Sequence, residues 1–174
     1  DGYYDSNNNY VAPINIEHYP NIKEYFDKLG PKFKNRPEQG VTPYNLRSCK
    51  YMHAFSKQKI IYSEIVQSPQ FYLDRDGKFM VEATAFMLTG VHLEYLVNFL
   101  NSEIVAWIFK KFYAGGGLGD TGFRYKKAFI EKLPIPKPKD DKVIYTDKEI
   151  ATLYGFDDEE TNYILSLLNS QRKK

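Results

Sequence analysis

Several features are scarce in this chain, and each scarcity excludes a class of protein. The 174 residues contain one cysteine, Cys49, so no internal disulfide can form, which fits a reducing compartment such as the cytoplasm. No apolar run approaches the ~18 residues of a membrane span. The longest candidate is interrupted by Glu94 and Glu103, so we expect no contact with a membrane. The sequence begins at Asp1, without Met or a signal peptide, and we therefore expect a fragment of a longer protein.

Signatures of common catalytic and metal sites are also missing. The three histidines lack metal-ligand spacing, and neither a P-loop nor a G-x-S-x-G pattern occurs. Residues 117–122 match G-x-G-x-x-G, but a nucleotide-binding loop follows a strand, whereas this one follows an expected helix. We therefore predict no dinucleotide, S-adenosylmethionine or metal site in this chain. The same glycines would instead let backbone amides approach an anion closely.

The sequence does contain an apolar, aromatic body. Hydrophobic residues make up 43% of the chain and aromatic residues 16%, which argues for a folded core. Periodicity and turn residues predict a helix from Pro20 with an apolar face (Ile22, Tyr25, Phe26, Leu29), strands over 59–65 and 83–88, helices over 92–101, 102–112 and 125–132, and terminal helices over 147–154 and 157–169. We expect an α+β fold: a small, mainly antiparallel β-sheet packed by helices, with a C-terminal helical tail.

Charge is distributed unevenly along the second half of the chain. Although the formal net charge is only +2, residues 110–139 hold eight basic and two acidic side chains. Residues 140–163 show the opposite balance, with eight acidic residues and two lysines. The basic stretch is also rich in glycine and interleaved with aromatic residues, a pattern typical of a surface that meets a phosphate backbone.

This basic stretch contains most of the residues that we predict to contact DNA. Arg124 is the best candidate for a base edge, because a guanidinium pairs bidentately with guanine, although another phosphate contact is the alternative. Phosphates would be bound by Lys110, Lys111, Lys126, Lys127 and Lys132, which supply affinity without sequence information. Weaker candidates for DNA contacts are Gln67, Gln70 and Thr121, together with the backbone amides of Gly116 and Gly117.

Aromatic residues in and before this stretch fall into two groups. Trp107 and Phe112 lie at helical spacing, where aromatic side chains more often belong to the core than to a platform for bases. Tyr113, Phe123 and Tyr125 sit in or beside the basic loop. For these three residues, contact with DNA and packing remain equal alternatives.

Taken together, several segments resemble a known family. They are the strand Lys59-Ile60-Ile61-Tyr62, an Asp-Gly turn, residues 95–102 (YLVNFLNS), 110–119 (KKFYAGGGLG) and 123–127 (FRYKK), and Leu133-Pro134-Ile135-Pro136. Over residues 44–138 they resemble the TaqI-like C-terminal specificity domain of adenine-specific DNA methyltransferases and Eco57I-type restriction-modification enzymes. We accordingly divide the chain into a lead-in with a helix (1–43), a target-recognition domain (44–138) and an acidic helical tail (139–174).

The resemblance implies a role in target recognition. The domain would clamp double-stranded DNA against the catalytic methyltransferase domain of the same protein, read bases in the major groove and help present a flipped adenine. The family's catalytic motif is missing, because the nearest segment, Ser68-Pro69-Gln70-Phe71, lacks the second proline. We therefore expect a fragment that is no enzyme by itself. Its bacterial parent would carry S-adenosylmethionine in a separate catalytic domain.

Two functions of other classes remain open. A protein-docking module would use the basic loop to bind an acidic partner, such as the chain's own tail. A nuclease would place Asp74, Asp76 and Lys78, with Glu64, around a magnesium ion, and Asp76→Asn would abolish cleavage. Asp76-Gly77 between apolar segments is, however, a strong hairpin signal. We favour a hairpin that joins residues 71–73 to 78–82.

Overall fold

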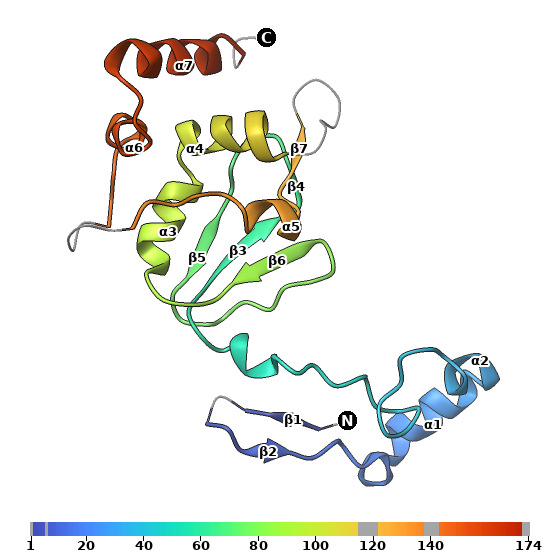
Figure 1. The fold of residues 1–174 in the computed structure, drawn as a ribbon. Coiled ribbons are helices and arrows are strands. Elements are labelled where there is room, and N and C mark those ends of the chain that lie inside the picture. The colour runs from blue at the N-terminus through green and yellow to red at the C-terminus, as the bar shows by residue number, and fades with distance from the viewer. Residues whose placement is uncertain (1, 6, 115–121, 138–142, 172–174) are drawn as a thin grey trace. The chain divides into compact units, whose positions relative to one another are not determined.

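The computed structural model describes residues 2–5, 7–114, 122–137 and 143–171. The chain divides into two compact units, Asp1–Lys57 and Gln58–Lys174. The first unit contains the strands β1 (Tyr3–Tyr4) and β2 (Tyr10–Val11), the helices α1 (Pro20–Lys28) and α2 (Pro31–Lys34), and the 3-10 helices η1 (Ile16–His18) and η2 (Met52–Ala54) (Figure 1).

The first unit is held together by local contacts. Helix α1 begins at Pro20 as predicted, because the fixed φ of proline suits a first helical turn. Phe26 stacks on Phe33 with ring centroids 4.8 Å apart. The other members of the predicted apolar face are exposed: Ile22, Tyr25 and Leu29. Within the described part of this unit, Ala54 is the only hydrophobic residue that is buried, at 8% exposure.

The second unit holds the core and all the candidate DNA contacts. Its strands are β3 (Lys59–Ser63), β4 (Ile65–Val66), β5 (Tyr72–Asp74), β6 (Ala85–Leu88) and β7 (Phe123–Arg124). Its helices are α3 (Leu93–Leu100), α4 (Glu103–Ile108), the π-helical turn η3 (Phe109–Tyr113), α5 (Lys127–Ile130), α6 (Asp147–Leu153) and α7 (Asp158–Gln171).

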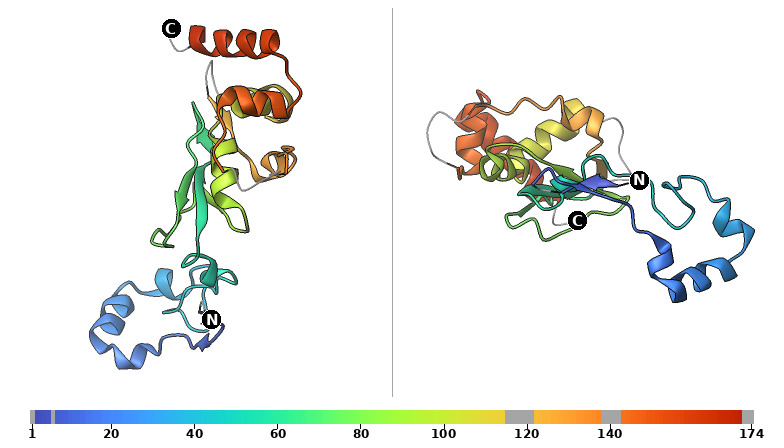
Figure 2. Two further views of the ribbon diagram at one scale, coloured as in Figure 1. Left: turned by 90° about the vertical axis from the view of Figure 1, so that its left-hand side faces the viewer. Right: turned by 90° about the horizontal axis from the view of Figure 1, so that it is seen from below.

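Two small antiparallel sheets form the strand layer of this unit. Strand β3 lies between β5 and β6, and Ile60 is in register with Leu73 on one side and Leu88 on the other. Beyond β3, the chain enters a second sheet in which β4 pairs with β7. Helix α3 packs on β3 and β5, and the helices gather on one face of the sheet (Figure 2). These features confirm the predicted α+β fold.

The predicted hairpin around Asp76-Gly77 is wrong. Strand β5 pairs with β3, and residues 78–82 form no strand. The Asp74 carboxylate accepts hydrogen bonds from the backbone N–H groups of Lys78 at 3.1 Å and Phe79 at 3.0 Å. Such bonds between a side chain and the backbone close a turn without a paired strand, so the chain leaves the sheet here.

The helical tail is tied to the rest of the second unit. Ser102 caps α4 as predicted, by accepting a hydrogen bond from the N–H of Val105. The Asp147 carboxylate of α6 accepts hydrogen bonds from the Ser102 hydroxyl and from the N–H of Glu103. Helix α4 packs on both α6 and α7, which confirms the two predicted terminal helices and explains why Ile150 is fully buried.

The π-helical turn corrects the prediction for Phe112. Continued α-helical spacing would put Phe112 on the same face as the buried Ile108 and Phe109. Instead, the N–H of Ala114 donates to the carbonyl of Phe109 at 2.8 Å, which closes a wider turn. The wider turn rotates Phe112 out of the core, and its side chain is 70% exposed. Trp107, by contrast, packs against the core as predicted.

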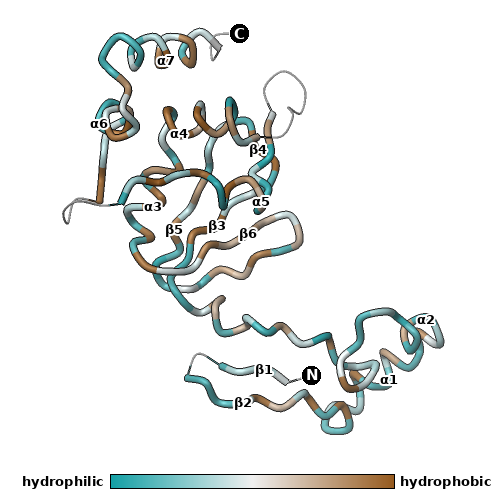
Figure 3. The backbone as a smooth tube through the Cα atoms, viewed as in Figure 1, coloured by the Kyte–Doolittle hydropathy of each residue, from teal (hydrophilic) through white to brown (hydrophobic). Residues whose placement is uncertain are grey.

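Apolar segments of β3, α3, α4 and α5 converge on one core (Figure 3). Aromatic rings make up its centre. The ring of Tyr125 lies 4.6 Å from that of Phe109, 4.8 Å from that of Phe71 and 4.9 Å from that of Phe123, measured between centroids. Because Phe109 belongs to η3 and Phe123 to β7, this aromatic contact fixes the two elements against each other.

Candidate nucleic-acid interface

The predicted basic residues come from three elements that pack together. Lysines 110 and 111 lie on η3, Arg124 lies on β7, and the remaining lysines lie on or beside α5. Helix α5 packs on η3, and the end of α4, β7 and α5 lie beside one another in Figure 1. We call these residues the basic cluster: Lys110, Lys111, Arg124, Lys126, Lys127 and Lys132.

Side chains alternate between the core and the surface along β7. Phe123 and Tyr125 are each 2% exposed, and their rings pack in the core. Packing is therefore the alternative that the structure shows for these two side chains. Arg124, between them, is 39% exposed and points to the opposite face, as the period of two in a strand requires. The buried rings thus support the surface on which the arginine lies.

Lys110 is the most enclosed member of the basic cluster. Its ammonium nitrogen lies 4.3 Å from the centroid of the Phe123 ring, a cation–π contact between η3 and β7. Burial lowers the pKa of Lys110 below its ordinary value. The next residue, Lys111, is exposed, whereas Tyr113 is half-buried and packs against the core. The π-helical turn therefore carries one lysine that contacts the Phe123 ring and one lysine that is exposed to solvent.

The lysines around α5 differ in their partners. Lys127 forms an ion pair with Glu131 of 3.5 Å, in which both side chains are exposed. The Lys126 nitrogen lies 5.9 Å from the centroid of the Phe129 ring. Within the described ranges, Lys111, Lys126 and Lys132 form no ion pair and are exposed. These three ammonium groups are free to meet an anion.

Arg124 has an acidic neighbour that the sequence did not assign to it. Its guanidinium lies 3.6 Å from the Glu64 carboxylate, and the two side chains are 39% and 29% exposed. The pairing of β4 with β7 causes this contact, because Ile65 is in register with Arg124 and Glu64 directly precedes Ile65. In the sequence, Glu64 suggests a functional role only in the nuclease alternative, since nothing local indicates that β4 pairs with β7.

The remaining predicted contacts are placed unevenly. Gln67 directly follows β4, Gln70 lies before β5, and both are exposed. Gly116, Gly117 and Thr121 lie outside the described residues. The glycine pattern that contains Gly117 is preceded by the helical elements α4 and η3 and followed by β7. This order is the reverse of the strand, loop and helix that a nucleotide-binding loop needs.

The carboxylates of the nuclease alternative are dispersed. Asp74 pairs with Lys59 inside the fold, Asp76 pairs with Lys78 at 2.6 Å, and Glu64 lies beside Arg124. In the part of the chain that the structure describes, no three His, Cys, Asp or Glu side chains gather as metal ligands do. Nor is any described helix long and apolar enough to cross a membrane.

Several acids of the tail act as helix caps. Thr146 and Glu149 form a reciprocal capping box at the start of α6. Asp157 and Glu160 exchange hydrogen bonds of 2.8 Å and 3.0 Å at the start of α7. Among residues that the structure describes, no ion pair joins this tail to the basic cluster. Glu149, Asp157 and Glu160 therefore stabilise their own helices, whereas Asp147 binds the start of α4.

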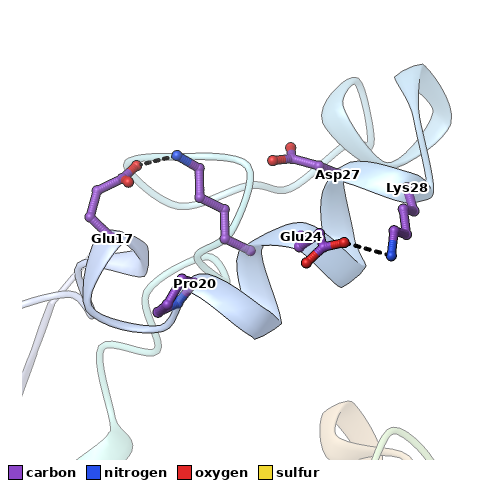
Figure 4. A pocket seen from close by; sticks show the side chains of 6 residues that line it. Glu17, Pro20, Glu24, Asp27 and Lys28 are labelled. Atoms are coloured by element: carbon purple, nitrogen blue, oxygen red, sulfur yellow. Dashed lines mark hydrogen bonds and ion pairs between the residues drawn. The ribbon is translucent and has the colours of Figure 1, made fainter.

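A concavity of about 550 Å³ lies beside α1 in the first unit (Figure 4). Its charged side chains already pair with one another or with a neighbour: Lys23 with Glu17 at 2.6 Å, Lys28 with Glu24 at 2.7 Å, and Lys34 with Asp27 at 3.0 Å. Because these charges are satisfied within the unit, the concavity offers no uncompensated group to a ligand.

Comparison with known proteins identifies the family. The model of the TaqI-like C-terminal specificity domain matches residues 8–135, which is well over half of the chain. The match begins within the segment 1–43 that we assigned to a lead-in. In a search of curated proteins, none matched the chain. On the extent of the family match, this chain belongs to the TaqI-like C-terminal specificity domains.

Proposed function

We propose that this chain recognises specific sequences of double-stranded DNA as part of a larger adenine-specific DNA methyltransferase or restriction-modification enzyme. One observation carries the proposal. Exposed lysines on η3 and around α5 lie on elements that pack together with β7, where the partly exposed Arg124 lies between the buried rings of Phe123 and Tyr125. Ammonium groups around a single guanidinium suit a duplex, whose phosphates surround the base edges in a groove.

The chemistry of these residues divides the work between them. Lys111, Lys126 and Lys132 carry unpaired charges among the described residues and would bind phosphates, which gives affinity for any sequence. Arg124 would donate a fork of hydrogen bonds to the O6 and N7 atoms of guanine, which gives sequence preference. Exposed Gln67, which directly follows β4, would add an amide that suits adenine.

Methyl transfer would belong to a separate catalytic domain of the same protein. That domain would bind S-adenosylmethionine and the flipped adenine, while this chain would fix the position of the DNA. Methyl transfer by the isolated chain is not part of the proposal, because the family's catalytic motif is missing from the sequence. The bacterial cytoplasm, where restriction-modification systems act, would be its location.

The salt dependence of DNA binding tests this proposal. Binding of the full chain to a duplex should weaken steeply with salt, with a log–log slope of about −0.9 for each phosphate contacted. Lys126→Ala should flatten that slope by about one unit and weaken binding to all sequences alike. Lys148→Ala, which removes an exposed lysine from the acidic tail, is the matched control and should change neither quantity. A slope near zero for the unaltered chain would contradict the proposal.

A further inference from the structure

The solvent-exposed face of the β4–β7 ribbon combines an apolar side chain with an arginine. Ile65 is 58% exposed and stands directly opposite Arg124, while Val66 and Phe123 face the core. The major groove of DNA admits a two-stranded β-ribbon, and apolar side chains there contact the methyl group of thymine. Lysines lie on the neighbouring elements, whereas the ribbon itself carries Arg124, and the Glu64 carboxylate directly precedes β4.

Glu64 is held in place by backbone hydrogen bonds on both sides. Its N–H donates to the carbonyl of Thr84 at 3.3 Å, and its own carbonyl accepts a hydrogen bond from the N–H of Tyr125 at 2.8 Å. Tyr125 is buried, so this anchor belongs to the core. The carboxylate therefore starts from a fixed point next to β7, which is a requirement for orienting a neighbouring side chain.

The distance between Glu64 and Arg124 leaves the guanidinium available. At 3.6 Å the two groups attract each other but lie beyond the range of a hydrogen bond. No described residue accepts a hydrogen bond from the Arg124 side chain. As far as the described residues are concerned, the five N–H donors of the guanidinium are available to a ligand, while the carboxylate restricts the directions in which the group points.

The carboxylate also selects the kind of acceptor that Arg124 meets. A phosphate carries a full negative charge, so Glu64 repels it from this position. The O6 and N7 atoms of guanine are neutral acceptors, and a nearby carboxylate disfavours them much less. We propose that Glu64 is a positioning residue that directs Arg124 to guanine and away from the phosphate backbone. This inference rests on the proposed function and assigns sequence specificity to an ion pair.

Binding to a randomised duplex library tests this assignment. The full chain and its Glu64→Gln variant are each used to enrich the library, and their affinities are then compared on one enriched duplex and one unrelated duplex. The variant should bind the unrelated duplex more tightly, with a steeper salt dependence, because Arg124 becomes free to bind phosphate. The ratio of the two affinities should fall roughly tenfold, and the preference for guanine should weaken.

Two further variants separate positioning from a general effect of charge. Glu131→Gln removes the carboxylate that pairs with Lys127, and it should raise both affinities without changing their ratio. In an Arg124→Ala background, Glu64→Gln should no longer change the ratio, because there is no guanidinium left to orient. The inference is overturned if Glu64→Gln behaves like Glu131→Gln. A full chain that binds no duplex would instead refute the proposed function itself.

Discussion

Strand β3 has an ion pair at each end, and the two pairs differ in burial. At its start, Lys59 and Asp74 are 0% and 2% exposed and lie 2.5 Å apart. Just beyond its end, Glu64 and Arg124 are each about a third exposed and lie 3.6 Å apart. The chemistry of the two pairs is alike, but the first is closed to solvent and the second remains open to a ligand.

The partners of each pair explain this difference. The Asp74 carboxylate accepts hydrogen bonds from the Lys59 ammonium and from the N–H groups of Lys78 and Phe79. These bonds hold the turn after β5, so the pair serves the fold. The side chains of Glu64 and Arg124, by contrast, form no hydrogen bond with any described residue. An exposed pair of that kind adds little stability, which suits a role in binding.

Breaking the buried pair should have the largest effect. Asp74→Ala leaves the Lys59 ammonium without its carboxylate inside the fold and should lower the free energy of unfolding by about 3 kcal/mol. Urea denaturation followed by circular dichroism measures this loss. Asp76→Ala, in the same turn but in an exposed pair, should change stability by less than about 0.5 kcal/mol. Equal losses in the two variants would show that Asp74 is not a special position.

Acid should weaken the buried pair in a defined pH range. Burial would raise the pKa of Asp74, but hydrogen bonds from Lys59, Phe79 and Lys78 outweigh it and lower that pKa to about 2. An unfolded chain has an aspartate pKa of ~3.9. The folded state therefore binds the proton less well, and the stabilisation is complete above about pH 4 and is lost as the pH falls through 2.

The measurement that checks this pH dependence compares the chain with its Asp74→Asn variant. The gap between their free energies of unfolding should shrink by about 2 kcal/mol from pH 5 to pH 2. Taking the difference removes the titration of carboxylates that both chains share. A gap that stays constant over this range would mean that the pKa of Asp74 is the same in the folded and unfolded chains.

Much of the fold could be predicted from the sequence, because its helices depend on local signals. Pro20 at a first turn, Ser102 as a cap and the apolar spacing of α3 each act within a few residues. The errors occurred where a hydrogen bond from a side chain to the backbone, or an unusual turn, decides the structure. Asp74 bonds to its own turn and prevents the hairpin, and a π-helical turn moves Phe112 out of the helical stripe.

The candidate site likewise has a part that the sequence predicts and a part that depends on contacts between distant segments. Lysines and arginine stand out by charge alone, so the basic cluster could be predicted from composition. The surroundings of Arg124 could not, because β4 and β7 are distant in sequence and each is only two residues long. Strands this short give no periodic signal. Glu64 therefore looked like a member of an acidic cluster until the pairing of β4 with β7 placed it next to Arg124.

Removing Arg124 should affect DNA binding, in contrast to the loss of stability that removing Asp74 should cause. Arg124→Ala should weaken binding to an enriched duplex by about 1–3 kcal/mol, because a bidentate contact with guanine is lost. Its effect on an unrelated duplex should be much smaller. Arg124→Lys keeps the charge but not the planar fork, so it should lose most of the discrimination as well. Equilibrium binding at one fixed salt concentration gives both numbers, and equal losses on both duplexes would reassign Arg124 to phosphate.

The smallest expected effect is the change in stability when the exposed Glu64–Arg124 pair is broken. Glu64→Gln should change the free energy of unfolding by less than about 1 kcal/mol, because ion pairs that remain near solvent contribute little. The same urea denaturation that measures Asp74→Ala would measure it. If Glu64→Gln changes stability little but reduces sequence discrimination, the Glu64–Arg124 pair serves binding and the Lys59–Asp74 pair serves the fold. If Glu64→Gln instead destabilised the chain as much as Asp74→Ala, the Glu64–Arg124 pair would serve the fold. Its guanidinium would then be held too firmly to bind a base.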